Sequence, residues 1–390
     1  MIQIRPQARK RNAAVKNAEM PIRVQPATSR REMNEFIQWP MTLYRNDLFF
    51  VPPLIRERKA FFSADNPIFK FTEVAYFLAK DQQGETVGRM TAHINRRHNE
   101  FAGERAGFFG FFECVEDLEA ARALLNAGEA WLRERGMSVI RGPFNFSTND
   151  ECAFLARGFD SMPVFQMPYT KRYYLDFMAA LEYRPVKDLL AYLYQATGEI
   201  PPRVVRFAER ASERTGVTIR TFDRSRSAEE VKSMFEIYNR AWEKNWGFIP
   251  MEEAELRYAA KNMGQVLDPS LALLAEKDGR PIGFSLTVPD YNPLFKKMNG
   301  RLLPFGFLHF LFGRRSIRRI RIVAFGVIQE YHNRGVEPLL MYHTFKNALL
   351  KGHTSCDMSW ILEENILARR VLDNLGAVPY KTYRIFEKSL

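Results

Sequence analysis

The sequence has 390 residues, of which 46% are hydrophobic and 13% aromatic. This composition excludes a disordered or acidic-tail protein, and the length is enough for about two ordinary domains with their own cores. The 57 Lys and Arg residues exceed the 45 Asp and Glu residues and give a net charge of +12. An excess of positive charge indicates anionic partners: nucleotide phosphates, an acidic carrier protein, anionic lipid or nucleic acid.

The three cysteines are few and scattered, at Cys114, Cys152 and Cys356. We therefore expect neither a disulfide framework nor a metal site, and a reducing cytoplasm is the simplest location. No run approaches the roughly 18 apolar residues of a membrane-spanning helix, and the basic first residues lack the apolar core of a signal peptide. We interpret residues 1–19 as a flexible basic tail.

The chain repeats one order of elements. After a strand expected at 22–24 and a helix near Ser29, residues 75–88 and 272–283 both read as strand, Lys-Asp turn and strand. Each hairpin is followed by an apolar strand, a helix ending at Gly and another strand. The repetition predicts an α/β fold of two tandem units, each a mixed central sheet flanked by helices. The predicted domains are 20–199 and 200–390, with a bridging helix over 203–214.

A strand, a tight loop and a helix lie together between residues 321 and 352. The run 322–328 is apolar and β-branched, and the helical pattern begins at Val336. Between them, Asn333, Arg334 and Gly335 place free backbone N–H groups at a helix start, which suits a phosphate or pyrophosphate. An ordinary strand-to-helix turn is the alternative.

This loop and the order of elements around it resemble the GNAT superfamily of acyl-CoA-dependent N-acyltransferases. His332 stands where that family has Gln or Arg, Glu337 where it has Gly or Ala, and Leu372 where it has its general-acid Tyr. The resemblance implies that acyl-CoA is the co-substrate. It implies cofactor-binding roles along the thioester arm and at the pyrophosphate for Phe325, Val327, Ile328, Asn333, Arg334 and Gly335.

The first unit lacks a Gly-rich basic loop after its apolar strand. Glu113, Glu116, Asp117 and Glu119 stand there instead and would repel a pyrophosphate. We interpret residues 20–199 as a degenerate unit that supplies a wall of the acceptor cleft. The polar loop with Asn145, Ser147, Asn149 and Asp150 either faces that cleft or is a plain loop rich in capping residues.

A helical pattern beginning at Ser227, its expected cap, precedes the stretch NWGFIPM. In GNAT units the first helices and their connecting loop wall the acceptor site. The resemblance thus implies substrate contacts for Tyr238, Trp242, Asn245, Trp246 and Phe248. Trp242 and Trp246 are spaced i,i+4, and an ordinary core role for this pair is equally consistent with the pattern.

Acylation of an amine needs a proton acceptor, because an alkyl ammonium has a pKa near ~10.4. By order of elements we predict Glu363 as the base, with Asn365 orienting the thioester arm. His332 is predicted as a further proton acceptor or a phosphate contact. The alternatives are an exposed helix-start carboxylate, a helix cap and a structural histidine.

The segment between Pro289 and Arg321 places an apolar run directly before a cluster of arginines. It is too short to span a bilayer but suits an interfacial or lid segment with basic residues at anionic head groups. A buried element beside a solvated basic strand edge is the alternative.

The stretches NWGFIPM, SWILEEN and YKTYRIFEK resemble a bacterial GNAT subgroup that includes the ceramide synthases. The resemblance implies acyl transfer from acyl-CoA, or an acyl carrier protein, to an amine acceptor such as a long-chain sphingoid base. The scattered cysteines and the apolar and basic segment between Pro289 and Arg321 predict an enzyme in the cytoplasm, peripheral on the inner face of the cell membrane. The alternatives are a non-catalytic acyl-CoA-binding protein and an acetyltransferase for a small soluble amine. Nucleic acid is not favoured as a partner, because no helix-turn-helix, zinc or RNP-like pattern is present.

Overall fold

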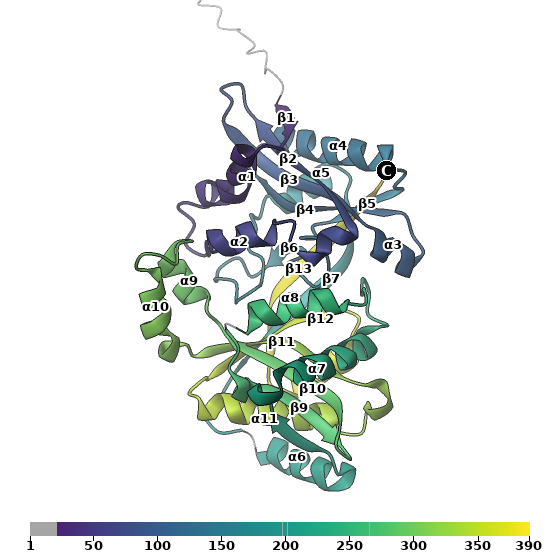
Figure 1. The fold of residues 1–390 in the computed structure, drawn as a ribbon, viewed down its shortest axis with the longest axis vertical. Coiled ribbons are helices and arrows are strands. Elements are labelled where there is room, and N and C mark those ends of the chain that lie inside the picture. Colours follow the sequence, from purple (N-terminus) through teal and green to yellow (C-terminus); the bar gives the residue numbers. More distant parts are fainter. Residues whose placement is uncertain (1–21, 197, 201, 265) are drawn as a thin grey trace, which may run out of the picture.

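The computed structural model describes residues 22–196, 198–200, 202–264 and 266–390, and the predicted tail at 1–19 lies outside this range. The described chain is built on one continuous 13-stranded β-sheet with helices packed against it (Figure 1). Only two neighbouring strand pairs, β4–β5 and β11–β12, are parallel. The prediction of an α/β fold with two tandem units of mixed sheet and flanking helices is confirmed.

The N-terminal half follows the expected order of elements. Ser29 is the cap of the first helix, where its side chain and that of Glu32 form a capping box. The strands are β1 (Arg23–Pro26), β2 (Thr72–Lys80), β3 (Thr86–Asn95), β4 (Ala106–Cys114), β5 (Val139–Gly142), β6 (Phe154–Arg157) and β7 (Arg184–Gln195). The helices are α1 (Arg30–Leu43), α2 (Ile55–Phe61), α3 (Arg96–Ala102), α4 (Leu118–Glu134) and α5 (Tyr174–Ala180).

The C-terminal half repeats this order, with two short helices, α9 and α10, where the N-terminal half has α3. Its strands are β8 (Thr218–Thr221), β9 (Ala272–Lys277), β10 (Arg280–Pro289), β11 (Arg319–Val327), β12 (Ser355–Leu362) and β13 (Val378–Ser389). Its helices are α6 (Pro202–Thr215), α7 (Ser227–Trp242), α8 (Glu253–Met263), α9 (Asn292–Met298), α10 (Gly306–Gly313), α11 (Val336–Leu350) and α12 (Ile366–Leu375).

The expected helix cap at Ser227 is wrong. Ser227 is the first residue inside α7, and no side chain caps that helix. The chain before it forms a 3-10 turn, Arg224–Arg226, and Asp223 caps this turn by accepting from the Ser225 amide at 2.9 Å. The side-chain cap therefore lies at Asp223, before the 3-10 turn that leads into α7.

From either end of the sheet, the first five strands are the first five of one half in chain order, and the two central strands, β13 and β7, are exchanged between the halves. The order of strands runs β1-β2-β3-β4-β5-β13-β7-β12-β11-β10-β9-β8. The last strand of the N-terminal half, β7, pairs with β12, and the last strand of the chain, β13, pairs with β5. Each half thus contributes a strand to the sheet of the other. The domain boundary between 199 and 200 remains a prediction, and the sheet is continuous across it.

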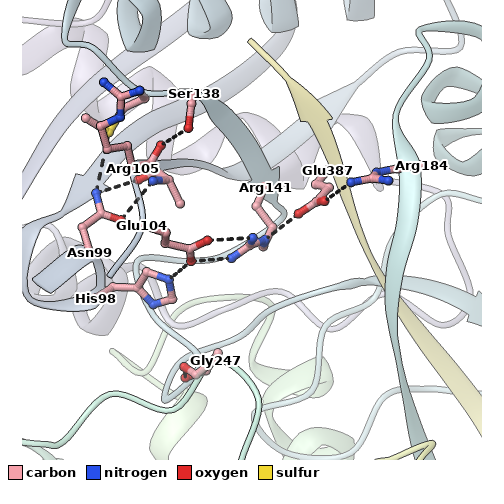
Figure 2. A network of polar contacts seen from close by, with 12 residues as sticks. His98, Asn99, Glu104, Arg105, Ser138, Arg141, Arg184, Gly247 and Glu387 are labelled. Atoms are coloured by element: carbon pink, nitrogen blue, oxygen red, sulfur yellow. Dashed lines mark hydrogen bonds and ion pairs between the residues drawn. The ribbon is translucent and has the colours of Figure 1, made fainter. Parts of the chain in front are cut away.

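A polar network ties the exchanged strand β13 to the N-terminal half (Figure 2). Arg141 on β5 donates to both oxygens of Glu104, at 2.9 and 3.2 Å, and to Glu387 on β13 at 3.0 Å. Glu387 also accepts from Arg184 on β7 at 2.8 Å. Burial raises the pKa of Glu104, but hydrogen bonds from Arg141 and His98 outweigh it and hold that pKa below its usual value.

Apolar cores lie on both faces of the sheet. In the N-terminal half, Leu124 and Leu132 of α4 pack against β2, β3 and β4, and in the C-terminal half Leu339 and Leu340 of α11 pack against β9 and β10. The three cysteines are buried free thiols. These cores fix the strands from which the candidate site is built.

We predict that Arg141→Met lowers the free energy of unfolding by about 3 kcal/mol, because it leaves two partly buried carboxylates, Glu104 and Glu387, without their shared partner. Arg122→Met is the control, since Arg122 forms only an exposed pair with Glu119, whose loss costs less than about 1 kcal/mol. Urea unfolding of both variants measures the difference. Equal destabilisation would show that the network does not hold β13 in place.

Candidate functional site

The two parallel strands of the C-terminal half, β11 and β12, separate partway along their length. Their ladder runs from Arg319 opposite Ser355 to Ile322 opposite Met358, and β11 then continues to Val327. Both strands have a β-bulge at this point, because their registers shift against β10 after Ile322 and against β7 after Met358. A bulge bends its strand and increases the local twist, which accounts for the separation.

Two side chains reach the backbone of β11 beyond this point. Trp242 Nε1 donates to the Phe325 carbonyl oxygen at 3.2 Å, and His332 Nε2 lies 2.7 Å from the Val327 carbonyl oxygen. Ile328 is buried, and its amide donates to Ile282 on β10. Its contact with Val327 places the His332 side chain beside β11 and not at the start of α11. An extended ligand with amide groups can pair with a strand edge of this kind.

The loop before α11 has the conformation expected of an anion site. Asn333 and Gly335 have positive φ angles of 60° and 94°. A Cβ at Gly335 would lie 3.1 Å from Ala211 on α6, so glycine is favoured there by both conformation and packing. α11 begins at Val336, and no side chain among the described residues caps its first turn. Its first amides are therefore available to an anion, and the exposed Arg334 stands next to them.

The corresponding region of the N-terminal half is closed. β4 and β5 pair only as far as Phe108 opposite Arg141, and the chain then folds onto β4, where the Phe144 amide donates to the Phe109 carbonyl at 2.7 Å. A Cβ at Gly110 would lie 1.8 Å from the Phe144 oxygen, so the two backbones are in direct contact.

The helix that follows β4 also differs from α11 at its start. The Asp117 carboxylate accepts from the amides of Glu119 and Ala120, at 2.8 and 3.5 Å, and so caps α4. A fixed negative charge thus occupies the place that an anionic ligand would need.

Three of the five residues predicted to contact substrate form one aromatic cluster. The ring of Tyr238 lies 4.6 Å from that of Trp242 and 5.8 Å from that of Phe248, between centroids. Trp246 instead points to the N-terminal half, where it stacks on Phe144 at 6.4 Å. Asn245 is exposed and contributes its backbone to the turn after α7. The cluster lies next to β11, because Trp242 also holds the Phe325 carbonyl.

The polar loop of the N-terminal half meets this cluster. Asn149 accepts from the Tyr238 hydroxyl, and Thr148 donates to the Gly247 carbonyl at 2.9 Å. A small recess lies here, between the two halves. It is lined by Asn95, His98, Phe108, Arg141, Phe144, Phe146, Ser147, Thr148, Trp246, Gly247 and Ile249. Gly247 lies beneath the polar network in Figure 2.

Asp150, in the same loop, has a half-buried side chain whose carboxyl group accepts from the Ser147 hydroxyl at 2.8 Å. Burial raises its pKa to about 7, and the negative charges of Glu151 and Glu255 act in the same direction, against Ser147 and Arg58. A carboxyl group with a pKa near neutrality can accept and release a proton at physiological pH. The sequence placed Asp150 in this loop but did not distinguish it from its neighbours.

Glu363 and Asn365 lie at the exposed turn between β12 and α12. The Asn365 side chain caps α12 by accepting from the Ala368 amide at 3.1 Å, and the Glu363 amide donates to Asp188 on β7 at 3.2 Å. Within the described residues, neither forms a hydrogen bond or ion pair with β11 or with the loop before α11. Their predicted catalytic roles remain predictions.

The structure also places charged groups where the two strands part. Arg321 and Asp357 are opposite each other in the ladder and are 4% and 0% exposed. Asp357 accepts from the Tyr380 hydroxyl at 2.7 Å, and burial raises the pKa of Asp357. The Nε of Arg321 and the Nε1 of Trp360 are buried without an acceptor among the described residues. The available signal was a charge inside each apolar strand, in RIRIVAF and SCDMSWI.

Comparison with known proteins places this geometry among acyltransferases. No protein-family model matches the chain. Protein YghO of Escherichia coli (strain K12) is 34% identical over 369 residues, which cover 93% of this chain and 94% of YghO. The bacterial ceramide synthase of Caulobacter vibrioides (strain NA1000 / CB15N) is 34% identical over 373 residues, which cover 94% of this chain and 97% of the synthase.

Two solved structures have the same fold at low sequence identity. A tandem GNAT protein from the clavulanic acid biosynthesis pathway has a TM-score of 0.55 and 12% identity, and the match covers 94% of this chain and 98% of that protein. A GCN5-related N-acetyltransferase from Sphaerobacter thermophilus has a TM-score of 0.50 and 16% identity, with 80% of each chain covered. At such identities the likeness shows the fold alone.

We predict that Arg334→Glu raises the dissociation constant for acyl-CoA at least about tenfold, because it reverses a charge beside the first turn of α11. The side chain is exposed, so the melting temperature should not change. Arg370→Glu on α12 is the matched control, since it makes the same charge reversal on another helix. Isothermal titration calorimetry with acyl-CoA measures the effect. Unchanged affinity, or equal loss in both variants, would contradict the loop's predicted role.

A second prediction concerns stability and pH. The pKa of Asp150 is about 7 in the folded protein against an ordinary 3.8. Between about pH 4 and pH 7 the folded state therefore holds a proton that the unfolded chain has released, and stability falls as pH rises through this window. Asp150→Asn should reduce this fall, whereas Asp278→Asn, at an exposed turn, should not. Urea unfolding at several pH values measures both. Parallel curves for wild type and Asp150→Asn would contradict the shift.

Proposed function

This chain belongs to the family of N-acyltransferase enzymes that includes the bacterial ceramide synthase, and we propose that it transfers an acyl group from acyl-CoA to a long-chain, sphingoid-type amine. The observation that carries the proposal is the difference between the two halves. In the C-terminal half the strands part and the α11 start is uncapped, whereas the equivalent places of the N-terminal half are filled by Phe144 and Asp117. We therefore assign activity to the C-terminal half.

In this proposal the pyrophosphate of acyl-CoA binds at Asn333, Arg334 and the first amides of α11. The pantetheine arm lies along β11 and pairs with its backbone near Phe325 and Val327. For this pairing the arm must share or displace the hydrogen bonds that Trp242 and His332 make to those carbonyls. The thioester then lies where β11 and β12 part. The Nε of Arg321, which lies 3.9 Å from Asp357 Oδ1, and the Nε1 of Trp360 have no hydrogen-bond acceptor among the described residues. Both are near this point and suit an oxygen that gains negative charge.

The reaction forms a carbon–nitrogen bond and breaks a carbon–sulfur bond. The neutral amine nitrogen attacks the thioester carbonyl carbon, the carbon–sulfur bond of the tetrahedral intermediate breaks, and CoA leaves as a thiolate that takes up the proton lost by the nitrogen. The nitrogen loses a proton to an acceptor on the enzyme. Glu363 is our predicted acceptor from the sequence. Asp150 is a second candidate, because its carboxyl group has a raised pKa and lies in the loop that contacts Tyr238.

Support for a lipid acceptor comes from the ceramide synthase relative and from the exposed apolar segment beside α9. A long alkyl chain gains roughly 0.8 kcal/mol for each buried methylene, which a small polar amine cannot gain. An acyl carrier protein is an alternative donor that the net charge of +12 also suits. We propose that the enzyme acts on this acceptor at the inner face of the cell membrane.

The test is an acylation assay with the purified protein. With a long-chain 2-amino alcohol we expect release of free CoA thiol and formation of an amide, which mass spectrometry detects. For a short-chain amine we expect a kcat/KM at least about tenfold lower. A preference for the short amine would favour a small-molecule acetyltransferase. Failure to consume any acyl-CoA or acyl carrier protein thioester, with binding retained, would favour a non-catalytic protein.

Two variants in the same assay identify the proton acceptor. If Glu363 is the base, Glu363→Gln lowers kcat about a hundredfold without changing acyl-CoA affinity, because a proton acceptor acts only during the reaction. Asp150→Asn is the matched comparison and keeps an acceptor for the Ser147 hydroxyl. If only Asp150→Asn lowers kcat, the acceptor comes from the N-terminal half and Glu363 has no catalytic role.

A further inference from the structure

The segment 302–312, which includes α10, exposes an unusual amount of apolar surface. Six of its large apolar side chains are exposed: Leu302 by 39%, Leu303 by 67%, Phe305 by 72%, Phe307 by 42%, Leu311 by 52% and Phe312 by 76%. α10 has the sequence GFLHFLFG, and none of its residues is buried. A helix that is apolar all round is normally buried, so a surface of this kind needs a partner. The alternative prediction of a buried element is wrong.

α10 is nonetheless held in a defined position against α9. The Phe310 ring lies 5.1 Å from that of Tyr291, whose hydroxyl donates to the Val266 carbonyl at 3.1 Å. A Cβ at Gly313 would lie 2.5 Å from the Leu294 side chain, so the end of α10 is close against α9. Phe310 therefore anchors one side of the helix, and the other side stays exposed. In Figure 1, α9 and α10 stand at the edge of the molecule, away from the sheet.

Basic residues flank this apolar surface along the chain. Residues 291–329 contain no Asp or Glu, and the exposed Arg301 directly precedes segment 302–312. Arg314 and Arg315 follow α10 directly and are exposed. Apolar side chains next to basic ones match the boundary of an anionic bilayer, where the rings enter the acyl region and the guanidinium groups meet phosphate. An apolar protein partner would not require the basic rim.

We propose that segment 302–315 docks the protein on the surface of an anionic lipid bilayer. Among the described residues, no helix is long and apolar enough to cross a membrane. α10 has eight residues and a length of about 12 Å, so it can lie in the interface with its exposed side chains inserted. That the docked enzyme takes its acceptor from the bilayer rests on the proposed function. The docking itself does not.

The test compares binding to vesicles of phosphatidylglycerol and phosphatidylcholine with binding to phosphatidylcholine alone, by co-sedimentation. The apolar variant changes the most exposed side chains to serine: Leu303, Phe305, Leu311 and Phe312. It spares Phe310, which packs on Tyr291, so the fold should be retained, as circular dichroism will check. The charge variant is Arg314→Gln with Arg315→Gln. The control is Leu350→Ser with Leu367→Ser, which changes side chains that are 79% and 65% exposed on α11 and α12.

We expect the wild type and the control to bind the anionic vesicles and to bind phosphatidylcholine much less. The apolar variant should lose at least tenfold in binding, and the charge variant about tenfold or more, since each basic residue contributes about fivefold. Equal binding by the wild type and the apolar variant would overturn the proposal. So would a wild-type dimer, seen by analytical ultracentrifugation, that the apolar variant converts to a monomer, because the surface would then join two copies.

The two proposals fail separately. A folded apolar variant that leaves the vesicles but keeps its turnover with a short-chain amine supports docking apart from catalysis. If the wild type consumes no thioester and yet binds vesicles through this segment, the acyl transfer proposal fails and the docking proposal stands.

Discussion

The last strand of each half hydrogen-bonds into the sheet of the other half, and the positions of the candidate site residues depend on this exchange. β12 pairs with β7, a strand from the N-terminal half, and its bulge against β7 lies between Met358 and Ile361. This is the point at which β12 leaves β11. β7 therefore sets in part the direction of β12 and the separation of β12 from β11, although β7 precedes both strands by more than a hundred residues.

The exchange of β7 and β13 also gives the N-terminal half a structural role, although only the C-terminal half has an accessible helix start. The N-terminal half carries a capped α4 and a closed β4–β5 junction, yet it supplies β7, the Thr148–Asp150 loop and the recess beside Gly247. A duplicated unit that loses its own ligand site can keep such a role, because removal of its strand would leave the edges of β12 and β13 unpaired. Structure and any remaining function of this half are thus coupled through the sheet.

Buried charges mark the same central region. Arg141 and Glu387 join β5 to β13, and Arg321 lies opposite Asp357 where β11 and β12 part. The first pair is satisfied by further partners, Glu104 and Arg184, whereas the second leaves the Arg321 Nε without an acceptor. Burying an unsatisfied donor costs stability, so such a group calls for an explanation, and for Arg321 we propose contact with a ligand. The first network holds the fold, and the second lies at the candidate site.

The sequence by itself determined the local elements and the family. The Ser29 cap, the two Lys-Asp hairpins and the strand, loop and helix around Gly335 follow from local patterns, because capping, turn geometry and apolar period are set by neighbouring residues. Phe325 was predicted as a cofactor contact and Trp242 as a substrate contact, and the structure places the Trp242 indole on the Phe325 carbonyl.

Only the tertiary structure decided the pairing partners of β7 and β13, the exposure of α10, the burial of Arg321 and Asp357, and the surroundings that raise the pKa of Asp150. Strand partners, exposure and burial depend on residues far apart in the chain, which a local pattern does not specify. The cap expected at Ser227 failed for a related reason, since Asp223 binds a preceding turn that the helical period does not reveal. The same alternation of apolar residues fits β13 in its own half or in the other, and packing of the whole sheet selects between them.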